Sequence, residues 1–495
     1  MTPTSSPAAA PGPADAHFTP EQRRVLAILL MPLFLSLMSV SVVNVALPAI
    51  ESGLGASSAD LQWVLSGYTL TFGVVLVAAG RAGDLWGRKP LFLAGIAVYV
   101  LGSLLAGLAW SPVVLNGARL LMGIGAGLFN PQIIGVIQST FSGRARGTAY
   151  GMFGTVIGLG VAVGPLLGGL LMGLLGPEAG WRASFLVNAP IGLLALLLGV
   201  LWLHPPTRTA AVVPRGLRAL DPVGVVLLGA ATVSLMLPFI LPGTWWLLAM
   251  AAALLTAWWL WEKRVRAAAP HTGVHPMVDP ALLRRPSFTF ATLHTSVYMG
   301  TMPGAFAVIA VFVQQGLGHS ALAAGMITLA SALLVTASST WIGSQVHRFG
   351  PWFVFTGAAL GVASMLALML AFVRVADGAW PLWTLAALLI PQGASQALIM
   401  TSAQVLMMDD VLPEEAGSAG GVAQTAQRVG TSIGLAMVTG VYFSALAGTG
   451  HAPTAHEYGV AGGSALAVVA GSWALVLVSA GADLLRRRRS RARAA

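Results

Sequence analysis

Long apolar stretches, separated by short polar ones, recur along nearly the whole chain. Most of them hold about 20 residues with few charges, the length that an α-helix needs to cross the hydrocarbon core of a bilayer. The pattern therefore predicts an all-α integral membrane protein with about fourteen transmembrane helices. The predicted spans are residues 25–49, 61–80, 90–109, 112–136, 148–174, 184–203, 219–241, 243–261, 287–314, 321–344, 352–373, 380–406, 419–446 and 461–484.

Polar linkers divide these spans into groups of six, two and six. Two groups of six predict a duplicated transporter that binds its substrate between the halves, near the middle of the membrane. The first residues are rich in Pro, Ala and Ser, which predicts a disordered tail. The predicted segments are a tail (1–24), an N-terminal six-helix bundle (25–204), a cytoplasmic linker (205–218), an inserted two-helix hairpin (219–261), a second cytoplasmic linker (262–286), a C-terminal six-helix bundle (287–484) and a basic cytoplasmic tail (485–495).

Composition supports this interpretation and excludes several functions. Hydrophobic residues make up 56% of the 495 residues and charged residues only 8%, so lipid must be the solvent for most of the surface. The absence of cysteine excludes disulfides, thiol catalysis, zinc–thiolate clusters and iron–sulfur centres. The chain has no phosphate-binding P-loop motif, no paired intramembrane carboxylates and no nucleophile–base arrangement. We therefore expect no cofactor, no metal site and no enzymatic activity.

The net charge of +10 would suggest a nucleic-acid partner in a soluble protein, but the positions of the charges indicate membrane topology instead. With the N-terminus in the cytoplasm, all but four of the 26 Lys and Arg residues fall on the cytoplasmic side. Arg182 and Arg374 fall outside, and Arg119 and Arg428 fall within predicted spans. We expect a multi-pass protein of the cell membrane with both termini in the cytoplasm. Its basic C-terminal tail anchors this topology or contacts anionic lipid.

A short loop between the second and third predicted spans has the sequence GRAGDLWGRK, Gly80 to Lys89. Its glycines allow a tight turn, Asp84 can accept hydrogen bonds from amides at a helix end, and Arg88 supplies countercharge. With this loop the chain resembles the major facilitator superfamily, whose signature is G-x-x-x-D-x-x-G-R-K/R. The resemblance implies that the loop latches the two halves together at the cytoplasmic face. A degenerate echo, GSQVHRFG at residues 343–350, follows the second span of the second half.

A glycine-rich helix is predicted at residues 148–174. Small residues let helix backbones approach closely in lipid, and neighbouring helices can satisfy the carbonyl that a proline leaves free. The segment resembles the antiporter motif of the family, G-x8-G-x3-G-P-x2-G-G, which implies an exporter with this helix at the moving seam; generic tight packing is the alternative. The matching positions are Gly151, Gly160, Gly164, Pro165, Gly168 and Gly169.

Arg119 lies about 10 Å inside the fourth predicted span, at 1.5 Å per residue. An arginine within the membrane is costly and is a functional-site hypothesis by default. The surrounding LNGARLLMGIGAG resembles the family motif R-x-x-x-G-x-G, which implies a role in proton coupling. The alternative is a structural arginine that bonds backbone carbonyls or extends its charge toward the membrane surface.

Four further segments resemble one branch of the family. They are SVVNVALPAI (41–50), LQWVLSGYTL (61–70), WRASFLVNAPIG (181–192) and AGGVAQTAQRVGTSIG (419–434). Together with the central hairpin they are similar to the 14-helix drug:proton antiporters of the EmrB/QacA type. This resemblance covers nearly all of residues 25–484 and implies two six-helix bundles with an inserted hairpin.

The chain departs from that branch at the positions of its usual acids. Proton antiport commonly uses a carboxylate within the membrane, whose pKa desolvation raises toward neutrality. Members of the branch often carry acids where this chain has Ser39 and Ser66. All sixteen acids here fall in tails, loops or ends of predicted helices. The coupling mechanism is therefore open.

Several coupling schemes remain possible at this point. Acids at span ends can bind the proton, with Glu51 and Asp60 facing outside and Asp84 facing inside. His294 in the ninth span is another proton carrier, although a plain polar neighbour is the simpler interpretation. Alternatively, the charge of the substrate drives transport, or transport is uncoupled.

Arg119 and Arg428 are the only charged residues away from the ends of predicted spans, which favours anionic, zwitterionic or neutral amphiphiles over cations. We expect a monomeric secondary active exporter of small amphipathic drugs or natural products, with protons as a coupling partner and membrane lipids around it. A lipid or lipid-precursor transporter is the alternative, and a membrane sensor without transport is a third. The predicted cavity residues are Ser39, Asn44, Trp63, Ser66, Tyr68, Asn130, Gln314, Gln396, Gln404 and Gln427, and Arg428 joins the predicted coupling residues.

Overall fold

Helices make up every regular element of the structure that is described here. The computed structural model describes residues 18–203, 216–241, 243–272, 276–447 and 451–494. Within these ranges the predicted all-α fold is confirmed. The predicted linker at 205–218 and the predicted tail at 1–24 lie mostly outside the described residues.

The N-terminal half contains six helices. Their bounds are α1 (Pro20–Leu54), α2 (Ser58–Trp86), α3 (Arg88–Gly107), α4 (Pro112–Thr140), α5 (Gly143–Leu186) and α6 (Asn188–Trp202). α5 is interrupted at Gly176, where φ is 80°, a conformation that favours glycine. The sharp kink in this helix is thus at Gly176, whereas Pro165 lies in continuous helix.

A hairpin and the C-terminal half follow. The hairpin consists of η1 (Leu217–Leu220), α7 (Pro222–Met236), η2 (Leu237–Phe239) and α8 (Leu247–Thr272). The C-terminal half consists of η3 (Leu282–Arg284), α9 (Pro286–Val311), the π-helical turn η4 (Phe312–Gly316), α10 (Ala321–Ala376), α11 (Trp383–Met407), η5 (Pro413–Glu415), α12 (Ala416–Ala447) and α13 (Ala455–Ala494).

Eleven helical stretches among the described residues are long and apolar enough to cross a membrane. Two of them, Gly143–Trp202 and Leu322–Ala376, contain 60 and 55 residues. Each is far longer than the roughly 20 residues that one crossing needs. α8 is not among the eleven, because charged residues begin at Glu262 within the helix.

Two helices continue past the predicted ends of their spans. α8 runs to Thr272 through the segment predicted as a linker at 262–286, and α13 runs to Ala494 through the tail predicted at 485–495. Both extensions are rich in Ala and Arg, which are good helix formers. The predicted boundaries therefore mark where the apolar pattern ends, and the helices extend beyond it.

The start of α1 also differs from the predicted boundary at residue 25. Thr19 accepts a hydrogen bond from the backbone N–H of Gln22, and the Gln22 side chain accepts one from the backbone N–H of Thr19. This capping box starts the helix at Pro20, ahead of the apolar pattern.

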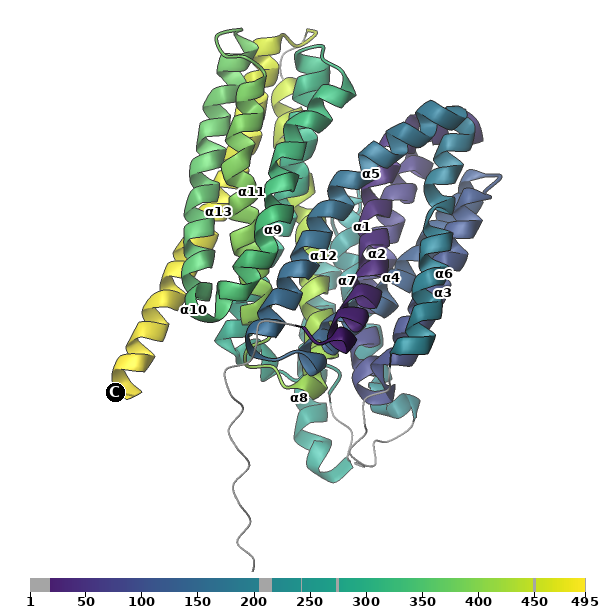
Figure 1. Ribbon diagram of the computed structural model, residues 1–495, viewed down its shortest axis with the longest axis vertical. Helices are drawn as coiled ribbons and strands as arrows, with labels where there is room; N and C mark the ends of the chain where they lie inside the picture. The colour runs from purple at the N-terminus through teal and green to yellow at the C-terminus, as the bar shows by residue number, and fades with distance from the viewer. Residues whose placement is uncertain (1–17, 204–215, 242, 273–275, 448–450, 495) are drawn as a thin grey trace, which may run out of the picture.

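α10 turns back on itself near Pro351. The hydroxyl of Ser331 donates to Gln392 on α11 at 2.6 Å, and the hydroxyl of Ser364 donates to the carbonyl oxygen of Leu388, also on α11, at 2.7 Å. Ser331 and Ser364 would lie about 50 Å apart on a straight helix. Because both reach the same turn of α11, α10 must fold into two arms, as Figure 1 shows. Proline lacks the N–H that would continue the helical ladder at the bend.

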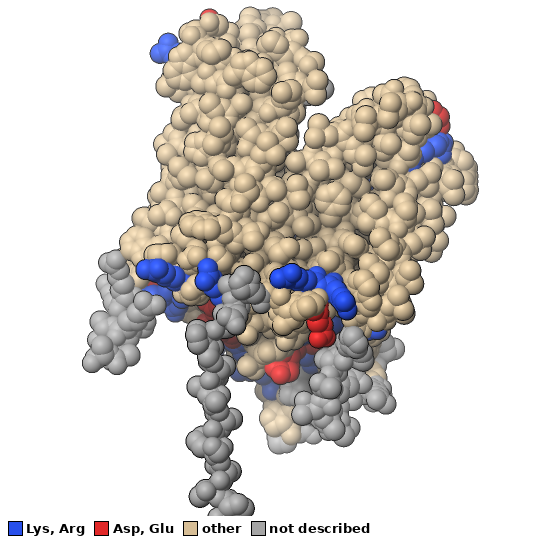
Figure 2. Space-filling model, in the orientation of Figure 1, with Lys and Arg blue, Asp and Glu red and all other residues tan. Residues whose placement is uncertain are grey.

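The two halves form bundles that lean together at one end and separate toward the other (Figure 1). The hairpin packs against α2 and α12. Charged side chains gather at the end where the bundles meet, and a notch opens between the bundles toward the opposite end (Figure 2). We call the charged end the basic end. Its residues include Arg88, Arg146, Arg285 and Arg487. Arg88 and Arg285 donate hydrogen bonds to Pro413 and Asp410, and Arg146 and Arg487 interact electrostatically with Asp409 of the same loop.

Backbone meets backbone where the bundles touch. A Cβ on Gly147 of α5 would lie 2.2 Å from the carbonyl oxygen of Gly343 on α10. A Cβ on Gly80 of α2 would lie 2.2 Å from the carbonyl oxygen of Gly417 on α12. Any side chain at these positions would hold the halves apart, so the closed basic end depends on glycine at both contacts.

The contact between α5 and α10 ends about halfway along α5. A Cβ on Gly158 would still meet Thr336 of α10, roughly 20 Å above the start of α5 at 1.5 Å per residue. From Gly160 onward α5 packs on α1 instead, where the hydroxyl of Ser41 donates to the carbonyl oxygen of Gly160 at 3.1 Å. A Cβ on Gly164 would lie 2.0 Å from that same hydroxyl oxygen.

The motif glycines of α5 therefore face different neighbours. Gly151 faces α10 of the other half, Gly160, Gly164 and Gly168 face α1 of their own half, and Gly169 has no neighbour within 4 Å of an added Cβ. α5 thus packs on α1 of its own bundle with one set of glycines and on α10 of the opposite bundle with another.

We expect Gly151→Ala to push the two bundles apart. The new Cβ would lie 2.7 Å from the carbonyl oxygen of Ser339 and 2.8 Å from the Cα of Thr340, and neither backbone atom can rotate away. The expected loss is about 1–3 kcal/mol of stability, typical of overpacking. Thermal unfolding of the purified protein, followed by tryptophan fluorescence, measures it. Gly169→Ala on the same helix is the control, and equal stability of the two variants would contradict the assigned contact.

Candidate functional site

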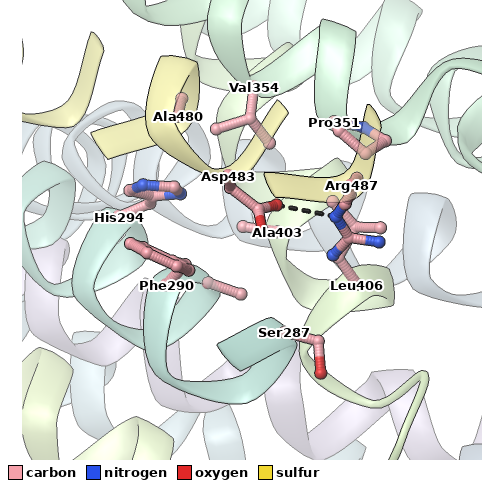
Figure 3. A pocket seen from close by; sticks show the side chains of 11 residues that line it. Ser287, Phe290, His294, Pro351, Val354, Ala403, Leu406, Ala480, Asp483 and Arg487 are labelled. Atoms are coloured by element: carbon pink, nitrogen blue, oxygen red, sulfur yellow. Dashed lines mark hydrogen bonds and ion pairs between the residues drawn. The ribbon is translucent and has the colours of Figure 1, made fainter. Parts of the chain in front are cut away.

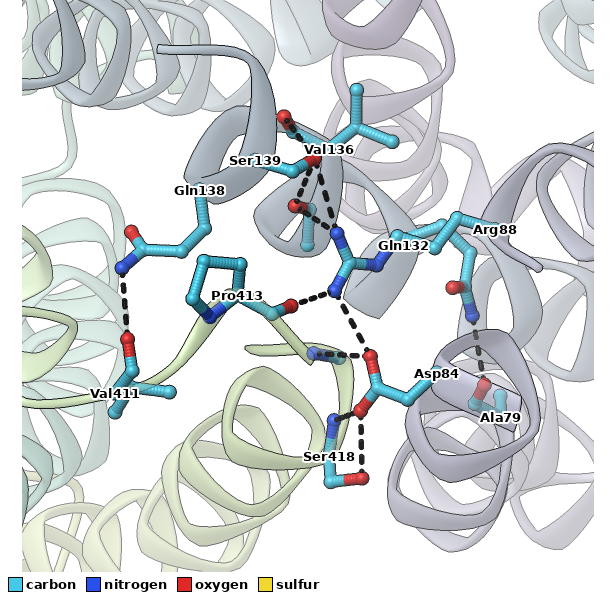
Figure 4. Close-up of polar contacts among 12 residues, drawn as sticks. Ala79, Asp84, Arg88, Gln132, Val136, Gln138, Ser139, Val411, Pro413 and Ser418 are labelled. Atoms are coloured by element: carbon cyan, nitrogen blue, oxygen red, sulfur yellow. Dashed lines mark hydrogen bonds and ion pairs between the residues drawn. The ribbon is translucent and has the colours of Figure 1, made fainter. Parts of the chain in front are cut away.

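Asp84 joins the two halves at the basic end (Figure 4). Its Oδ1 accepts a hydrogen bond from the backbone N–H of Gly417 at 3.1 Å, and its Oδ2 accepts from the backbone N–H and the hydroxyl of Ser418 at 2.8 and 2.9 Å. These N–H groups belong to the first turn of α12, where amides lack helical partners and the helix dipole favours negative charge. An acid of the N-terminal half thus caps a helix of the C-terminal half.

Arg88 strengthens the same junction. Its Nη2 forms an ion pair with Asp84 at 3.1 Å and donates to the carbonyl oxygen of Pro413 in the other half. Its Nη1 donates to the carbonyl oxygen of Gly135 and, at 3.2 Å, to the hydroxyl of Ser139, both on α4. Arg88 therefore ties α2, α4 and the start of α12 into one unit (Figure 4).

The charge on Asp84 is balanced by these partners. Burial raises the pKa of the Asp84 carboxyl above its ordinary value, whereas the ion pair with Arg88 and the hydrogen bonds from Ser418 act in the opposite direction. Separation of the halves would remove the Ser418 partners and expose the carboxyl to water. Closure of the basic end and the environment of this acid are therefore linked.

Other polar contacts between the bundles lie on the same side of the molecule. Gln138 of α4 donates from its Nε2 to the carbonyl oxygen of Met408 at 2.9 Å. It also donates to the carbonyl oxygen of Val411 at 3.2 Å (Figure 4). The Thr425 hydroxyl of α12 donates to the carbonyl oxygen of Gly73 at 3.0 Å. Throughout the described chain, the direct hydrogen bonds between the two bundles lie in the half nearer the basic end.

Arg119 is buried inside the N-terminal bundle, with 1% of its surface exposed. Its Nε donates to the carbonyl oxygen of Val64 at 2.8 Å, and its guanidinium carbon lies 4.5 Å from the ring centre of Tyr68. Its Nη1 makes no hydrogen bond, and no carboxylate pairs with it among the described residues. The positive charge is therefore stabilised mainly by an aromatic face and one carbonyl.

Arg428 projects from α12 onto the same aromatic pair from the other half. Its guanidinium carbon lies 4.3 Å from the ring centre of Phe72, one turn along α2 from Tyr68. The two rings are 5.8 Å apart and edge to face. The guanidinium of Arg428 interacts electrostatically with Tyr68, as does that of Arg119. Two arginines from opposite halves thus flank one pair of rings.

Ser39, a predicted cavity residue, lies in a buried polar network of the N-terminal bundle. Its Oγ accepts hydrogen bonds from the hydroxyl of Tyr99 at 2.7 Å and from the Nδ2 of Asn188 at 3.0 Å. Asn188 also donates to Ser103 at 3.0 Å. Ser39 has 0% exposure, so it lies inside the bundle, and Tyr99 links it electrostatically to Arg119.

The remaining predicted cavity residues are dispersed. Asn130 and Gln404 are buried, with Asn130 donating to the carbonyl oxygen of Ala126 on its own helix. Asn44 and Gln314 are exposed. The structure therefore does not bring these four together.

The other four predicted residues are partly buried. Trp63 and Ser66 both lie on α2. Trp63 packs against the hydrophobic cluster around Met236 of the hairpin. Gln427 donates to the hydroxyl of Thr295 on α9 at 3.1 Å, and Gln396 lies on α11. Of the predicted cavity residues, Tyr68 is thus the one that contacts Arg119 and interacts electrostatically with Arg428.

His294 lines a separate small cavity near the basic end (Figure 3). Its Nε2 lies 2.8 Å from the hydroxyl of Ser479, and Asp483 and Arg487 complete the wall. The cavity volume of about 10 Å³ has room for about one water molecule. His294 therefore faces no substrate-sized space, and Asp483 is paired with Arg487 at 2.8 Å.

Several residues of this site were not predicted. Gln138, Tyr99 and Asn188 were missed, as was the contact between Phe72 and Arg428. Ser103 and Asn188 interrupt apolar stretches, and a polar residue inside a predicted span is the signal that could have marked them. Among the described residues no group of acidic or imidazole side chains has the arrangement of a metal site.

The closed glycine contacts, the Asp84 latch and the two bundles agree with a family match. A sequence model of the Major Facilitator Superfamily matches residues 29–241 and 217–435. The chain belongs to the major facilitator superfamily. Members of this superfamily are membrane transporters, so the chain is a multi-pass transport protein and not an enzyme. The predicted resemblance is confirmed.

Relatives within the superfamily are named as exporters or resistance proteins. The chain is 31% identical to the puromycin resistance protein Pur8 of Streptomyces alboniger, over 93% of this chain and 91% of that protein. It is 30% identical to the probable actinorhodin transporter of Streptomyces coelicolor, over 88% of this chain and 76% of that protein. It is 31% identical to the cephamycin export protein CmcT of Amycolatopsis lactamdurans, over 86% of each chain.

Solved structures show the same fold. The human organic anion transporter MFSD10 superposes with a TM-score of 0.61 at 16% identity, covering 94% of this chain and 100% of that one. The proton:xylose symporter XylE superposes with a TM-score of 0.61 at 15% identity, covering 92% and 95%. At this identity the likeness shows the facilitator fold alone.

We expect Asp84→Asn to open the basic end. The amide has one acceptor oxygen, and its NH₂ group opposes the N–H groups of α12, so charge-assisted hydrogen bonds worth about 1.5–3 kcal/mol each are lost. The closed population should fall at least tenfold. The chain has no cysteine, so spin labels at Arg144→Cys and His347→Cys, exposed positions on opposite halves, report the separation without background. Glu414→Gln, an exposed acid of the same end, is the control; an unchanged distance in Asp84→Asn would contradict the latch.

Proposed function

We propose that this chain is a secondary active exporter of small amphipathic molecules, such as antibiotics or other natural products, and that it works by alternating access. Relatives named for export of or resistance to actinorhodin, puromycin and cephamycin support the substrate class. The outward direction is further supported by the complete antiporter motif on α5. The two bundles would rock about the seam between α5 and α10.

The proposed topology has fourteen crossings with both termini in the cytoplasm. The two longest apolar stretches, of 60 and 55 residues, would each provide two crossings, and α8 would provide one more beyond the eleven stretches. The start of α1 contacts the end of α4 through Gln22 and Thr140, and α13 also ends at the basic end. Basic residues concentrate on the cytoplasmic side of membrane proteins, which supports placing the basic end there.

The observation that carries this proposal is the distribution of contacts between the bundles. Backbone-level glycine contacts and direct hydrogen bonds join them in the half nearer the basic end, and a notch separates them beyond it (Figure 2). With the basic end in the cytoplasm, this is an outward-open arrangement. Alternating access requires a second state in which the contacts at the basic end break.

Arg428 and the Tyr68–Phe72 pair form the proposed floor of the substrate site. Tyr68 and Phe72 are buried, Arg428 is partly buried, and the guanidinium of Arg428 has no ion-pair or hydrogen-bond partner among the described residues. An aromatic ring beside an unpaired guanidinium suits a substrate with both an aromatic surface and a negative or electron-rich group. Anionic, zwitterionic and neutral amphiphiles therefore fit better than cations.

The coupling ion is proposed to be the proton, taken up by groups outside the middle of the membrane. Arg119 and Arg428 are the charged residues at mid-depth, and Asp84 is the acid nearest the seam. Transport in proteoliposomes with the pH gradient and the membrane potential imposed separately tests this. We expect puromycin efflux to be accelerated by a pH gradient at zero potential. Transport that does not respond to the pH gradient would exclude proton antiport, and no transport of any amphiphile would exclude the exporter.

We expect Arg428→Gln to weaken transport of anionic substrates selectively. The pair of probes is an aromatic carboxylate dye and its neutral methyl ester, which differ in one charge. Loss of an ionic hydrogen-bonding group of this kind costs about 1.5–3 kcal/mol, or roughly 10–150-fold in apparent affinity for the carboxylate. Arg428→Lys, which keeps the charge, should retain part of the preference. Equal losses for the dye and its ester would contradict the assigned role of the guanidinium.

A further inference from the structure

Two carboxyl groups are buried together at the basic end of the hairpin. Asp221 precedes α7, and Glu262 lies on α8, one residue beyond the predicted span. A Cβ on Gly224 would lie 2.4 Å from an Asp221 oxygen and 3.0 Å from a Glu262 oxygen, which places both carboxyl groups around one point. Asp221 is 4% exposed and Glu262 is 0% exposed.

Asp221 has the partners that a carboxylate needs. Its Oδ1 accepts hydrogen bonds from the indole N–H of Trp261 at 2.8 Å and from the backbone N–H of Gly224 at 3.2 Å. It also caps the start of α7, where the helix dipole favours a negative charge. Hydrogen-bond donors and a helix N-terminus therefore surround the Asp221 carboxyl group.

The donors that face Glu262 have poorer geometry than those of Asp221. Neither of its carboxyl oxygens makes a hydrogen bond of good geometry, although the indole of Trp258 and the backbone of Met277 and Val278 lie nearby. The indole N–H of Trp258, itself 92% buried, also has no hydrogen-bond partner. Negative charges on both Glu262 and Asp221 would place two like charges next to each other in a buried site, which is more costly than a shared proton.

We infer that Asp221 and Glu262 together bind one proton while the basic end is closed, and that opening of this end releases it to the solution on the same side. This inference rests on the proposed alternation of the basic end between closed and open states. The ligand of the site is the proton, and the pair acts as a sensor of pH at the basic end. A proton taken from and returned to one side cannot drive transport, so this site is separate from the coupling site.

The charges around Glu262 support this assignment. Burial first, and then the charge of Asp221, raise the pKa of Glu262 from 4.5 to about 8. From α2, Arg81 interacts electrostatically with both acids and also with Asp84 and Glu415, so it is shared among four carboxylates. On α8 itself, the ammonium of Lys263 lies over the ring of Trp259, on its own helix.

The segment that covers Glu262 contributes no further free charge. Met277 and Val278 lie over the carboxyl group with their backbone. The acid of this segment, Asp279, pairs with Arg266 of α8 at 3.0 Å. Arg81 is therefore the cation through which the pair Asp221–Glu262 is linked to the latch.

The cover of Glu262 belongs to the seam between the halves. Residues 276–282 lead directly into α9 of the C-terminal bundle. With Arg81 of α2 and Glu415 and Ser418 of the other half, they line a cavity of about 120 Å³. Ser418 also donates hydrogen bonds to Asp84. Breaking the contact between Asp84 and the start of α12 would therefore move residues 276–282 and admit water to Glu262.

The direction of the pH effect follows from the raised pKa. The closed form holds the proton more tightly than the open form, in which Glu262 returns toward its ordinary value of 4.5. Acid pH therefore favours closure of the basic end. As the pH rises from about 4.5 to about 8, the ratio of closed to open protein should fall by up to about tenfold per pH unit.

The experiment measures the distance between labels at Arg144→Cys and His347→Cys from pH 5.5 to 8.5, in the purified full-length protein without substrate. Above pH 8 the wild type should populate the separated state, and below pH 6 the short distance should dominate. Glu262→Gln, which imitates the protonated acid, should keep the short distance at every pH. Glu414→Gln, an exposed acid of the same end, should respond as the wild type does.

A second measurement does not depend on movement. The infrared band of a protonated carboxyl group should be present in the wild type at pH 7 and reduced in Glu262→Gln, and thermal unfolding of both proteins checks that the variant is folded. A pH response of Glu262→Gln equal to that of the wild type, or an unchanged infrared band, would overturn this inference alone. A distance that stays fixed at every pH and with added puromycin would contradict alternating access as well.

Discussion

The closed contact between two glycine-lined helix pairs is the constraint on which the rest of this structure depends. Gly80 meets Gly417 and Gly147 meets Gly343 with no room for a side chain, so the backbones themselves touch. This closeness brings the first turn of α12 within reach of Asp84, whose carboxylate satisfies amides that have no helical partner. Packing and electrostatics are therefore coupled at one place, and a change in either opens the same end of the molecule.

Much of the fold could be predicted from the sequence because the bilayer imposes a length and a composition on each crossing. The missed features arise from effects that hydropathy does not contain. α8 and α13 continue past their apolar segments because helix propensity persists after hydrophobicity ends. Pro351 turns α10 back on itself, yet Pro165 leaves α5 helical, since tertiary contacts decide whether a proline bends a helix.

The candidate site was predictable only in part, for a related reason. Asp84 and Arg88 lie in a motif whose spacing reports their contact directly. Ser39 was expected in the cavity, but its contacts with Tyr99 and Asn188 come from three different helices and turn it inward. The burial of Glu262 depends on residues 276–278 crossing over it, and no local pattern announces such a long-range cover.

The two mid-depth arginines remain the least balanced charges of the described structure. Taking a guanidinium out of water costs several kcal/mol, and one carbonyl together with a cation–π contact of about 2 kcal/mol recovers only part of it. In Arg119, the buried Nη1 makes no hydrogen bond, so part of the cost of removing this guanidinium from water is not recovered. Arg428 lies at the seam, where a bound molecule can supply the missing negative partner. Under the proposed function, a substrate that supplies this partner would be bound more tightly in the state that exposes Arg428.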